Sequence, residues 1–497
     1  MKRISFVPTW LFFMFWLIGS FLLYSQSIRL DESQSIWVST KSLPFLLRTT
    51  AQDVHVPLYG TLLHFWLQIF GPSINAARTL SLLFFAGTLI TLYHLAKEVS
   101  SRKVALLTVS LYSLSPFILW YSSEARMYTL LTLATTLSHI AFLRFNRSDG
   151  REGKFGYVLS TIVGLYSHYF FLLLISAQVF YIWGRYVFGK KYNGASPYKR
   201  LVILHTVVVL ISLAALIPWV AYVMKLGGAS NTKPLIPPPS SFNLLQTFFV
   251  FLFGFQPTNT QSILISLWPL SVVFLFLIFT RKSRQIPSYG MGYFFLATFL
   301  PVFTAFFLSY IHPLFLSRYL IFVTPTLFLL LAWAIMNSAS RASTYVVTSL
   351  FILLFGLMWY HNLSNATPVK EDYRAVSEYL EKKARPQDVI AVSAPFTVYP
   401  IEYSYKGSSR IETIPSWNRY EEGGIPPFSE EDLKKQIEQY RISYSHIILI
   451  LSYDQGYENS IKNYFDKNYQ LRTVKKFPPG IEVREYKLRY DIKAWLN

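Results

Sequence analysis

Long apolar stretches recur along the first 360 or so residues of this chain and constrain its fold more than any other feature. An α-helix needs about 17–25 apolar residues to cross the hydrocarbon core of a bilayer. With 52% hydrophobic and only 14% charged residues, the chain is too apolar for an ordinary soluble protein of 497 residues. We predict a polytopic α-helical membrane protein of about eleven transmembrane helices. The candidate spans are 6–24, 76–96, 104–121, 127–145, 157–167, 169–187, 201–224, 262–280, 289–310, 319–336 and 344–360.

Charge divides the sequence into two regions. Residues 1–361 hold about 26 Lys and Arg against about 7 Asp and Glu, whereas residues 362–497 hold about 20 against about 19. Within the second region, 378–383 and 430–440 have helical patterns, and 389–392 and 446–451 have the pattern of buried strands. We therefore predict a transmembrane domain over 1–361 and a small C-terminal α/β domain over 362–497. The net charge of +20 does not indicate a nucleic-acid partner, because the basic residues lie between apolar runs rather than on one solvated face.

The basic residues between the spans predict the orientation of the chain. Lys and Arg are retained in cytoplasmic loops, and one set of alternate loops carries most of them, from Lys2-Arg3 to Arg341. We expect that set of loops and the N-terminus to lie in the cytoplasm. Because the predicted number of spans is odd, the C-terminal domain is then expected on the outer side of a cell inner or plasma membrane. The first apolar run also resembles a signal peptide, but its length favours a retained helix. No cysteine is present, so disulfides are excluded.

Three outer segments are long enough to fold, namely the C-terminal tail and two earlier segments. Segment 25–75 contains two amphipathic stretches, around Trp37 and over 57–67, which we expect to form helices lying on the membrane surface. Segment 225–257 contains a proline-rich patch at 234–239 and is expected to be an irregular loop.

Four carboxylates fall on the predicted outer side of the transmembrane region, and they are candidates for catalysis. These residues are Asp31, Glu32, Asp53 and Glu124. Acidic groups at the edge of the hydrocarbon region are costly and tend to be functional. The adjacent pair Asp31-Glu32 can equally solvate a helix end or cap the helix that follows, and periodicity alone does not decide between these roles.

Several arginines share that side, including Arg29, Arg78, Arg126 and Arg318. An arginine binds phosphate through two parallel hydrogen bonds and stays charged in proteins. Sugar transfer from a lipid phosphate needs such cations beside a carboxylate, which takes the proton from the acceptor hydroxyl while the arginines stabilise the departing phosphate. Taken one at a time, each arginine can also be an interfacial residue that extends its charge into water.

Two histidines on the outer side, His55 and His168, are candidate donors to a phosphate. Either could ligate a divalent metal with Glu124 or Glu32, but no short His-x-x-x-His spacing supports a metal site, so no cofactor is assigned. A hydrogen-bonded structural role fits both equally well. No glycine-rich phosphate loop is evident, which disfavours a soluble nucleotide-sugar donor.

Five short motifs occur in a characteristic order. They are Asp31-Glu32, His55-Val56-Pro57-Leu58-Tyr59, Ser123-Glu124-Ala125-Arg126-Met127-Tyr128, Leu165-Tyr166-Ser167-His168-Tyr169-Phe170 and Ser317-Arg318-Tyr319-Leu320. Together they resemble bacterial members of glycosyltransferase family 39, the protein O-mannosyltransferase-like group of the GT-C fold, which is related to the lipid A aminoarabinose transferases. The resemblance covers most of residues 1–361.

The resemblance implies roles for the residues of these motifs. The first-loop aspartate of that family is taken as the catalytic base, which corresponds to Asp31, and the acidic residue of the second outer loop corresponds to Glu124. Arg126 and Arg318 match arginines expected to contact phosphate. Val56 departs from the pattern, because relatives commonly have a second proline there. The remaining expected substrate contacts in the motifs are His55, His168, Tyr59, Tyr128, Tyr169 and Tyr319, with Glu32 beside the base.

The expected function is that of an inverting glycosyltransferase that moves a sugar from a polyprenyl-phosphate donor to an extracytoplasmic protein, lipid or glycan. A transporter or flippase of lipid-linked sugars is the alternative from another class, although its ionisable groups would be expected at mid-membrane. A polymerase or ligase of lipid-linked glycans is a third possibility.

Overall fold

The computed structural model describes residues 27–193, 198–227, 237–255, 290–337, 341–363, 371–420, 424–478 and 480–488. The chain packs as two compact units. The helical unit comprises Met1–Tyr24, His55–Gly227 and Pro234–Thr367, and the α/β unit comprises Ser25–Val54, Gly228–Lys233 and Pro368–Asn497. Segment 25–54 therefore packs with the C-terminal part of the chain. The domain boundary expected at residue 361 stays a prediction.

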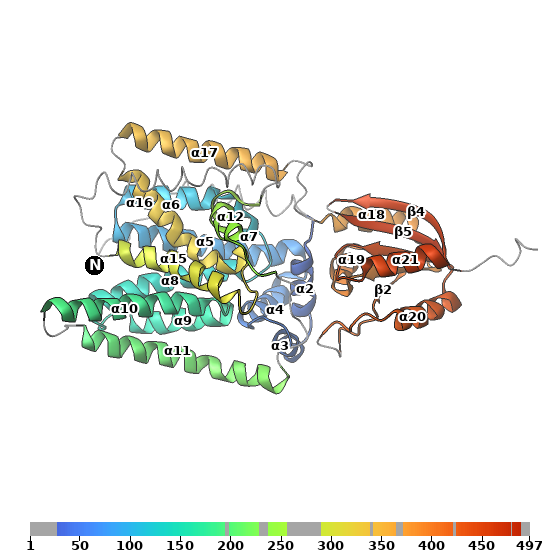
Figure 1. Ribbon diagram of the computed structural model, residues 1–497, viewed down its shortest axis with the longest axis horizontal. Coiled ribbons are helices and arrows are strands. Elements are labelled where there is room, and N and C mark those ends of the chain that lie inside the picture. The colour runs from blue at the N-terminus through green and yellow to red at the C-terminus, as the bar shows by residue number, and fades with distance from the viewer. Residues whose placement is uncertain are drawn as a thin grey trace, which may run out of the picture. The chain divides into compact units, whose positions relative to one another are not determined.

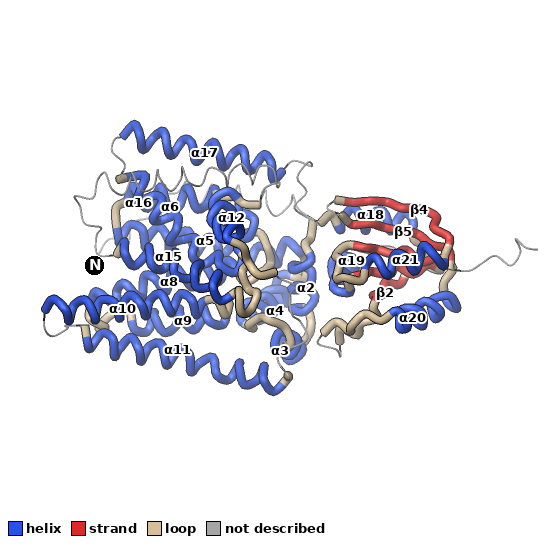
Figure 2. The backbone as a smooth tube through the Cα atoms, in the orientation of Figure 1, coloured by secondary structure: helices blue, strands red, loops and turns tan. Residues whose placement is uncertain are grey.

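The described part of the helical unit consists of helices joined by short turns (Figures 1 and 2). Six of these helices are long and apolar enough to cross a membrane, or up to seven if one bent pair is counted as a span. The predicted polytopic helical fold is confirmed, whereas the count of eleven stays a prediction, since spans 6–24 and 262–280 lie outside the described residues. The elements are α4 (Leu58–Phe70), α5 (Ile74–Val99), α6 (Arg102–Leu114), α7 (Pro116–Ser122), α8 (Tyr128–Arg147), α9 (Lys154–Ser167), α10 (Phe171–Asn193), α11 (Lys199–Lys225), α12 (Ser241–Phe253), α15 (Met291–Leu308), η1 (Ser317–Val323), α16 (Thr324–Met336) and α17 (Arg341–Leu363).

The predicted span 104–121 is in fact two helices, α6 and α7, which meet at an angle of 68°. Pro116 has no N–H to donate and disfavours a helical conformation in the residue before it. Ser115 accordingly adopts an extended conformation, with φ −60° and ψ 127°. Its hydroxyl donates to the carbonyl of Phe251 in α12 at 3.0 Å, which satisfies a polar group at the break.

Helix α12 was not expected, because the proline-rich patch made the whole segment 225–257 look irregular. Ser240 caps the helix: its hydroxyl accepts from the Asn243 N–H at 3.4 Å, and the Asn243 side chain accepts from the Ser240 N–H at 2.8 Å. This reciprocal cap followed by an apolar run was the signal that sequence analysis missed.

Hydrogen bonds between side chains join the helices inside the apolar unit. The side-chain hydroxyl oxygens of Thr91 in α5 and Thr136 in α8 lie 2.6 Å apart. The Tyr157 hydroxyl of α9 donates to Gln178 Oε1 of α10 at 2.8 Å and lies 2.9 Å from His205 Nε2 of α11. Such bonds hold helices together where the surroundings offer no other partner for a polar group.

The α/β unit contains a five-stranded sheet in the order β2-β1-β3-β5-β4. Figure 2 shows this sheet in red, with helices beside it. β1 pairs in parallel with β2 and β3, and β5 pairs antiparallel with β3 and β4. Three of the four elements expected in the tail are confirmed within longer elements, and the strand expected over 446–451 is confirmed with the same bounds. The elements of the unit are α2 (Leu30–Ser39), α3 (Leu43–Ala51), α18 (Tyr373–Lys383), β1 (Asp388–Ser393), η2 (Pro395–Thr397), α19 (Val398–Ser404), β2 (Arg410–Ile414), α20 (Glu430–Ser443), β3 (His446–Leu451), α21 (Glu458–Asn468), β4 (Gln470–Phe477) and β5 (Ile481–Lys487).

Both faces of this sheet are covered, because alternate residues of β1 and β3 enter different cores. Val389 and Leu449 pack with α20 and α21, whereas Ile390 and Ile450 pack with α18 and α19. Trp37 of α2 packs against the second core. Helix α2 is thus part of the hydrophobic packing of the C-terminal domain.

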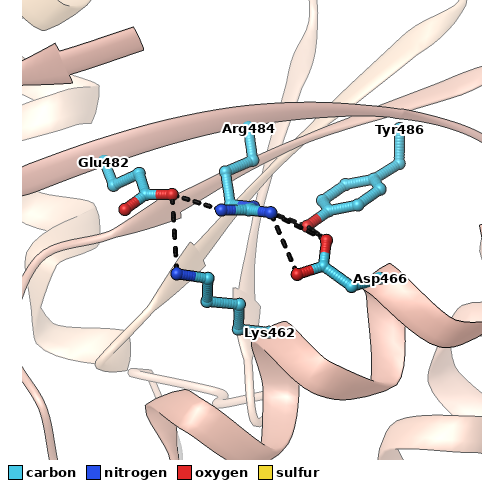
Figure 3. A network of polar contacts seen from close by, with 5 residues as sticks. All are labelled: Lys462, Asp466, Glu482, Arg484 and Tyr486. Atoms are coloured by element: carbon cyan, nitrogen blue, oxygen red, sulfur yellow. Dashed lines mark hydrogen bonds and ion pairs between the residues drawn. The ribbon is translucent and has the colours of Figure 1, made fainter. Parts of the chain in front are cut away.

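A polar network fixes β5 to α21 (Figure 3). The Arg484 guanidinium donates to both carboxylate oxygens of Asp466, at 2.7 and 3.0 Å, and also pairs with Glu482. The Tyr486 hydroxyl donates to Asp466 at 2.8 Å. Burial raises the pKa of Asp466, but the hydrogen bonds from Tyr486 and Arg484 outweigh it and lower the pKa overall.

Candidate functional site

Four basic side chains from separate turns of the helical unit gather around His168, and we call them the basic cluster: His55, Arg126, His168 and Arg318. Arg126 Nη2 lies 2.9 Å from His55 Nε2. The charges of His55, Arg126 and Arg318 all act on the His168 imidazole. Four residues that are up to 263 positions apart in the sequence are thus brought to one place.

Arg126 is held by the turn between α7 and α8. Its backbone N–H donates to the Glu124 carbonyl at 2.7 Å, and its side chain is 9% exposed. Its carbonyl oxygen accepts from the Ser81 hydroxyl of α5 at 3.5 Å, and that hydroxyl also lies 2.9 Å from the Tyr59 hydroxyl of α4. Tyr59 therefore supports the turn that carries Arg126. Ser81 was missed by sequence analysis, because a serine inside an apolar helix carries no distinguishing pattern.

His168 lies in the tight turn between α9 and α10, between the predicted spans 157–167 and 169–187. Its Nδ1 accepts from the Phe170 N–H at 3.1 Å. Burial, with the nearby charges of His55, Arg126 and Arg318, lowers the pKa of His168 to about 3. A neutral imidazole whose Nδ1 is an acceptor carries its proton on Nε2. His168 is thus a neutral hydrogen-bond donor at physiological pH.

The motifs around His168 and Arg318 pack together. The Tyr319 ring centroid lies 5.2 Å from that of His168 and 5.4 Å from that of Phe170. The Arg318 guanidinium carbon lies 5.6 Å from the Tyr319 ring centroid, a distance typical of a cation–π contact. Tyr319 therefore links the two basic residues.

The other residues expected at the site lie in different surroundings. The Tyr169 hydroxyl accepts from Trp219 Nε1 of α11 at 3.0 Å, so it fastens α11 to the turn. Tyr128 is fully buried and its ring lies 4.8 Å from that of Tyr121. Glu124 is 4% exposed in the same turn as Arg126.

Asp31 and Glu32 belong to the α/β unit, in the first turn of α2. Glu32 is fully buried, and its carboxylate accepts from the Arg29 N–H at 3.1 Å, which caps the helix. Asp31 is half-buried. Burial together with the negative charges of Glu371 and Asp31 raises the pKa of Tyr453, so Asp31 lies within electrostatic reach of that phenol. The expected proximity of Asp31 to the arginines of the basic cluster stays a prediction.

The basic cluster has the chemistry of an anion site. Two guanidinium groups supply fixed positive charge, and two imidazoles supply N–H donors: His168 through Nε2, and His55 through Nδ1 when its Nε2 accepts from Arg126. Within the described ranges, no group of three or more His, Cys, Asp or Glu residues is arranged to hold a metal ion. The arrangement is suited to a phosphate.

Known proteins share both the sequence of this region and the fold. Residues 54–222 match the family described as dolichyl-phosphate-mannose-protein mannosyltransferase. That segment contains His55, Arg126 and His168. No curated protein sequence matches the chain.

Solved structures match the chain over nearly its whole length. ArnT from Cupriavidus metallidurans in the apo state is 10% identical, with a TM-score of 0.62 over 96% of this chain and 97% of that chain. The same protein bound to undecaprenyl phosphate is 10% identical, with a TM-score of 0.59 over 96% and 98%. The arabinofuranosyltransferase AftD from Mycobacteria is 12% identical, with a TM-score of 0.52 over 98% of this chain and 40% of that chain.

These likenesses identify the fold. The chain has the GT-C fold of polytopic membrane glycosyltransferases, as the sequence predicted. Within that class, its resemblance to the protein mannosyltransferase-like group is confirmed by the matched segment 54–222.

Proposed function

We propose that this protein is an inverting glycosyltransferase that moves a sugar from a polyprenyl-phosphate donor to an extracytoplasmic acceptor. The observation that carries the proposal is the basic cluster, which gathers two arginines and two histidines in the helical unit. Three of its four members fall in the segment that matches the mannosyltransferase family. A solved structure of similar fold has been determined with undecaprenyl phosphate bound.

In the proposed reaction, the oxygen of an acceptor hydroxyl attacks the anomeric carbon of the donor sugar. The bond from that carbon to the phosphate oxygen breaks, and the polyprenyl phosphate leaves with the bonding electrons. Asp31 takes the proton of the acceptor hydroxyl as its general base. The configuration at the anomeric carbon inverts because the attack comes from the side opposite the leaving group.

The basic cluster has its part at the leaving phosphate. Arg126 and Arg318 stabilise the charge that grows there as the bond breaks, and the N–H groups of His55 and His168 donate to the phosphate oxygens. No general acid is needed, because a phosphate leaves readily without protonation. A His168 that stays neutral donates one hydrogen bond without repelling the nearby guanidinium groups.

One experiment separates this proposal from a transporter of lipid-linked sugars. The purified full chain is placed in liposomes with a panel of undecaprenyl-phosphate hexoses and pentoses and mixed acceptors. We expect release of the sugar from at least one donor, with formation of undecaprenyl phosphate detected by mass spectrometry. Movement of intact donor between leaflets with no cleavage of any donor would contradict the proposal.

A further inference from the structure

The helix that carries Asp31 is attached to the C-terminal domain by a group of aromatic and basic side chains. We call the group the Trp37 cluster, and it consists of Trp37, Lys41, Phe45, Tyr399, Arg419 and Tyr420. The Trp37 ring centroid lies 5.2 Å from that of Tyr399, 5.3 Å from that of Tyr420 and 5.8 Å from that of Phe45. Residues of α2 and α3 thereby interdigitate with residues from more than 350 positions later.

Arg419 is the centre of this cluster. Its guanidinium carbon lies 4.9 Å from the Trp37 ring and 5.1 Å from the Tyr399 ring. Both terminal nitrogens donate to the Glu402 carboxylate, at 2.9 and 2.6 Å. The side chain is only 12% exposed. A planar guanidinium group that binds a carboxylate along one edge and lies against aromatic rings is fixed in orientation. The ammonium group of a lysine cannot make the same set of contacts.

A second attachment lies at the other end of α2. The Arg374 N–H donates to the Ser27 hydroxyl at 3.2 Å, three residues before the helix begins. Asp31 acts electrostatically on Tyr453, which follows β3 and donates to the Glu371 carboxylate. The helix is therefore held by the C-terminal domain on both sides of Asp31.

The place where α2 docks is also distinctive. β1 and β3 are parallel neighbours, and the chain continues from them toward opposite edges of the sheet. In such sheets, ligands bind beside the carboxyl ends of the strands at this switch in direction. Here α2 contacts η2 and α19, which follow the carboxyl end of β1, and Asp31 lies within reach of Tyr453 beyond the end of β3. A helix of the same chain thus uses the edge at which other α/β domains hold a ligand.

We propose that the C-terminal α/β domain sets the position of Asp31 for sugar transfer, with Arg419 as the positioning residue that holds α2 through Trp37. The inference rests on the proposed function, since it assumes that Asp31 is the base. Asp31 and Trp37 are about 9 Å apart along the helix axis at a rise of ~1.5 Å per residue. A tilt of about 10° at Trp37 displaces Asp31 by about 1.5 Å, and displacements of this size lower rates by up to about 100-fold.

The test compares Arg419→Ala, Arg419→Lys and a control, Arg441→Ala, in the full chain. Arg441 pairs with Glu438 on α20 at 2.8 Å in the same domain and does not belong to the Trp37 cluster. We expect Arg419→Ala to lower kcat about 10- to 100-fold at unchanged affinity for undecaprenyl phosphate. Arg419→Lys should lie between it and the wild type, and the control should keep full activity. Wild-type kcat in Arg419→Ala would overturn the inference.

A second measurement keeps the test independent of activity and of misfolding. The chain has no cysteine, so spin labels at Thr40→Cys and Lys434→Cys report the position of α2 on the domain. Arg419→Ala should broaden the distance distribution, and the control should not. A chemical cross-link between Lys41→Cys and Tyr420→Cys should restore the kcat of Arg419→Ala. A cross-link would not restore kcat if Arg419→Ala were inactive because the chain misfolds. An unchanged distance distribution in Arg419→Ala would overturn the inference. A broadened distribution in Arg419→Ala, together with a wild-type chain that transfers no sugar, would instead count against the proposed function.

Discussion

Replacing Arg126 with alanine should weaken the binding of polyprenyl phosphate strongly. Arg126 is 9% exposed and lies 2.9 Å from the His55 imidazole, so its guanidinium is held in place before any ligand arrives. A hydrogen bond to a charged group contributes about 1.5–3 kcal/mol, which corresponds to an affinity about 10- to 150-fold lower. The loss should fall in the upper part of this range, because the site is largely shielded from water.

Two further variants make that prediction specific. Arg126→Lys keeps the charge but loses the planar fork, so we expect an intermediate loss of affinity. Arg147→Ala is the matched control, since Arg147 ends the same helix, α8, and pairs with Glu98 at 2.8 Å with half of its side chain exposed. Exposed ion pairs contribute about 0–1 kcal/mol, so binding should change by no more than a few-fold.

The assay for these variants is titration of undecaprenyl phosphate into the purified full chain in lipid nanodiscs, followed by native mass spectrometry. Binding should also weaken with added salt in the wild type, and less so in Arg126→Ala, because one charged contact is missing. Wild-type affinity in Arg126→Ala, or an equal loss in Arg147→Ala, would refute the assignment of Arg126 to the phosphate.

Three further predictions follow from the turns and from the C-terminal network. His168→Asn should keep most of the affinity for undecaprenyl phosphate, whereas His168→Ala should lower that affinity several-fold. Because burial lowers the pKa of His168 to about 3, the affinity of the wild type between about pH 5 and 8 should show no step from protonation of His168. Gly164→Ala should destabilise the α9–α10 hairpin by about 1–3 kcal/mol, because the new methyl would overlap the buried Phe171 ring, whereas Gly184→Ala, which meets open space, should not lower the melting temperature. Asp466→Asn should lower the melting temperature most at neutral pH, because a carboxyl whose pKa is lowered in the folded state stabilises above its ordinary value of 3.8 and loses that effect as the pH falls; an equal loss at acid pH would contradict this reasoning.

The sequence predicted those parts of the fold in which the local residue pattern alone determines the secondary structure. In a bilayer the backbone must satisfy its hydrogen bonds within a helix, so apolar length alone located α5, α8, α11 and α17. Short apolar runs typical of buried strands likewise located β1 and β3, and helical patterns located α18 and α20. Helix α12 was missed because the prolines before it carried the stronger local signal, and the break at Pro116 was missed because hydropathy does not register a bend.

The site was predictable only in part. Residue type and order along the chain selected Arg126, Arg318, His55 and His168, and the structure brings these four together. Their partners were not predictable, since each comes from another turn. Glu32, expected beside the base, caps α2 in the structure, and its part in catalysis stays a prediction. The attachment of Trp37 to Arg419 joins segments that no local pattern relates.

The measurement that tests the central claim most directly is sugar transfer by Asp31→Asn. The amide keeps the size of the side chain but cannot take a proton from the acceptor hydroxyl. We predict that the variant inserts into membranes and binds undecaprenyl phosphate as the wild type does, while its rate of transfer falls at least about 100-fold. Transfer at the wild-type rate would show that Asp31 is not the base and that the reaction proposed here does not occur at this residue.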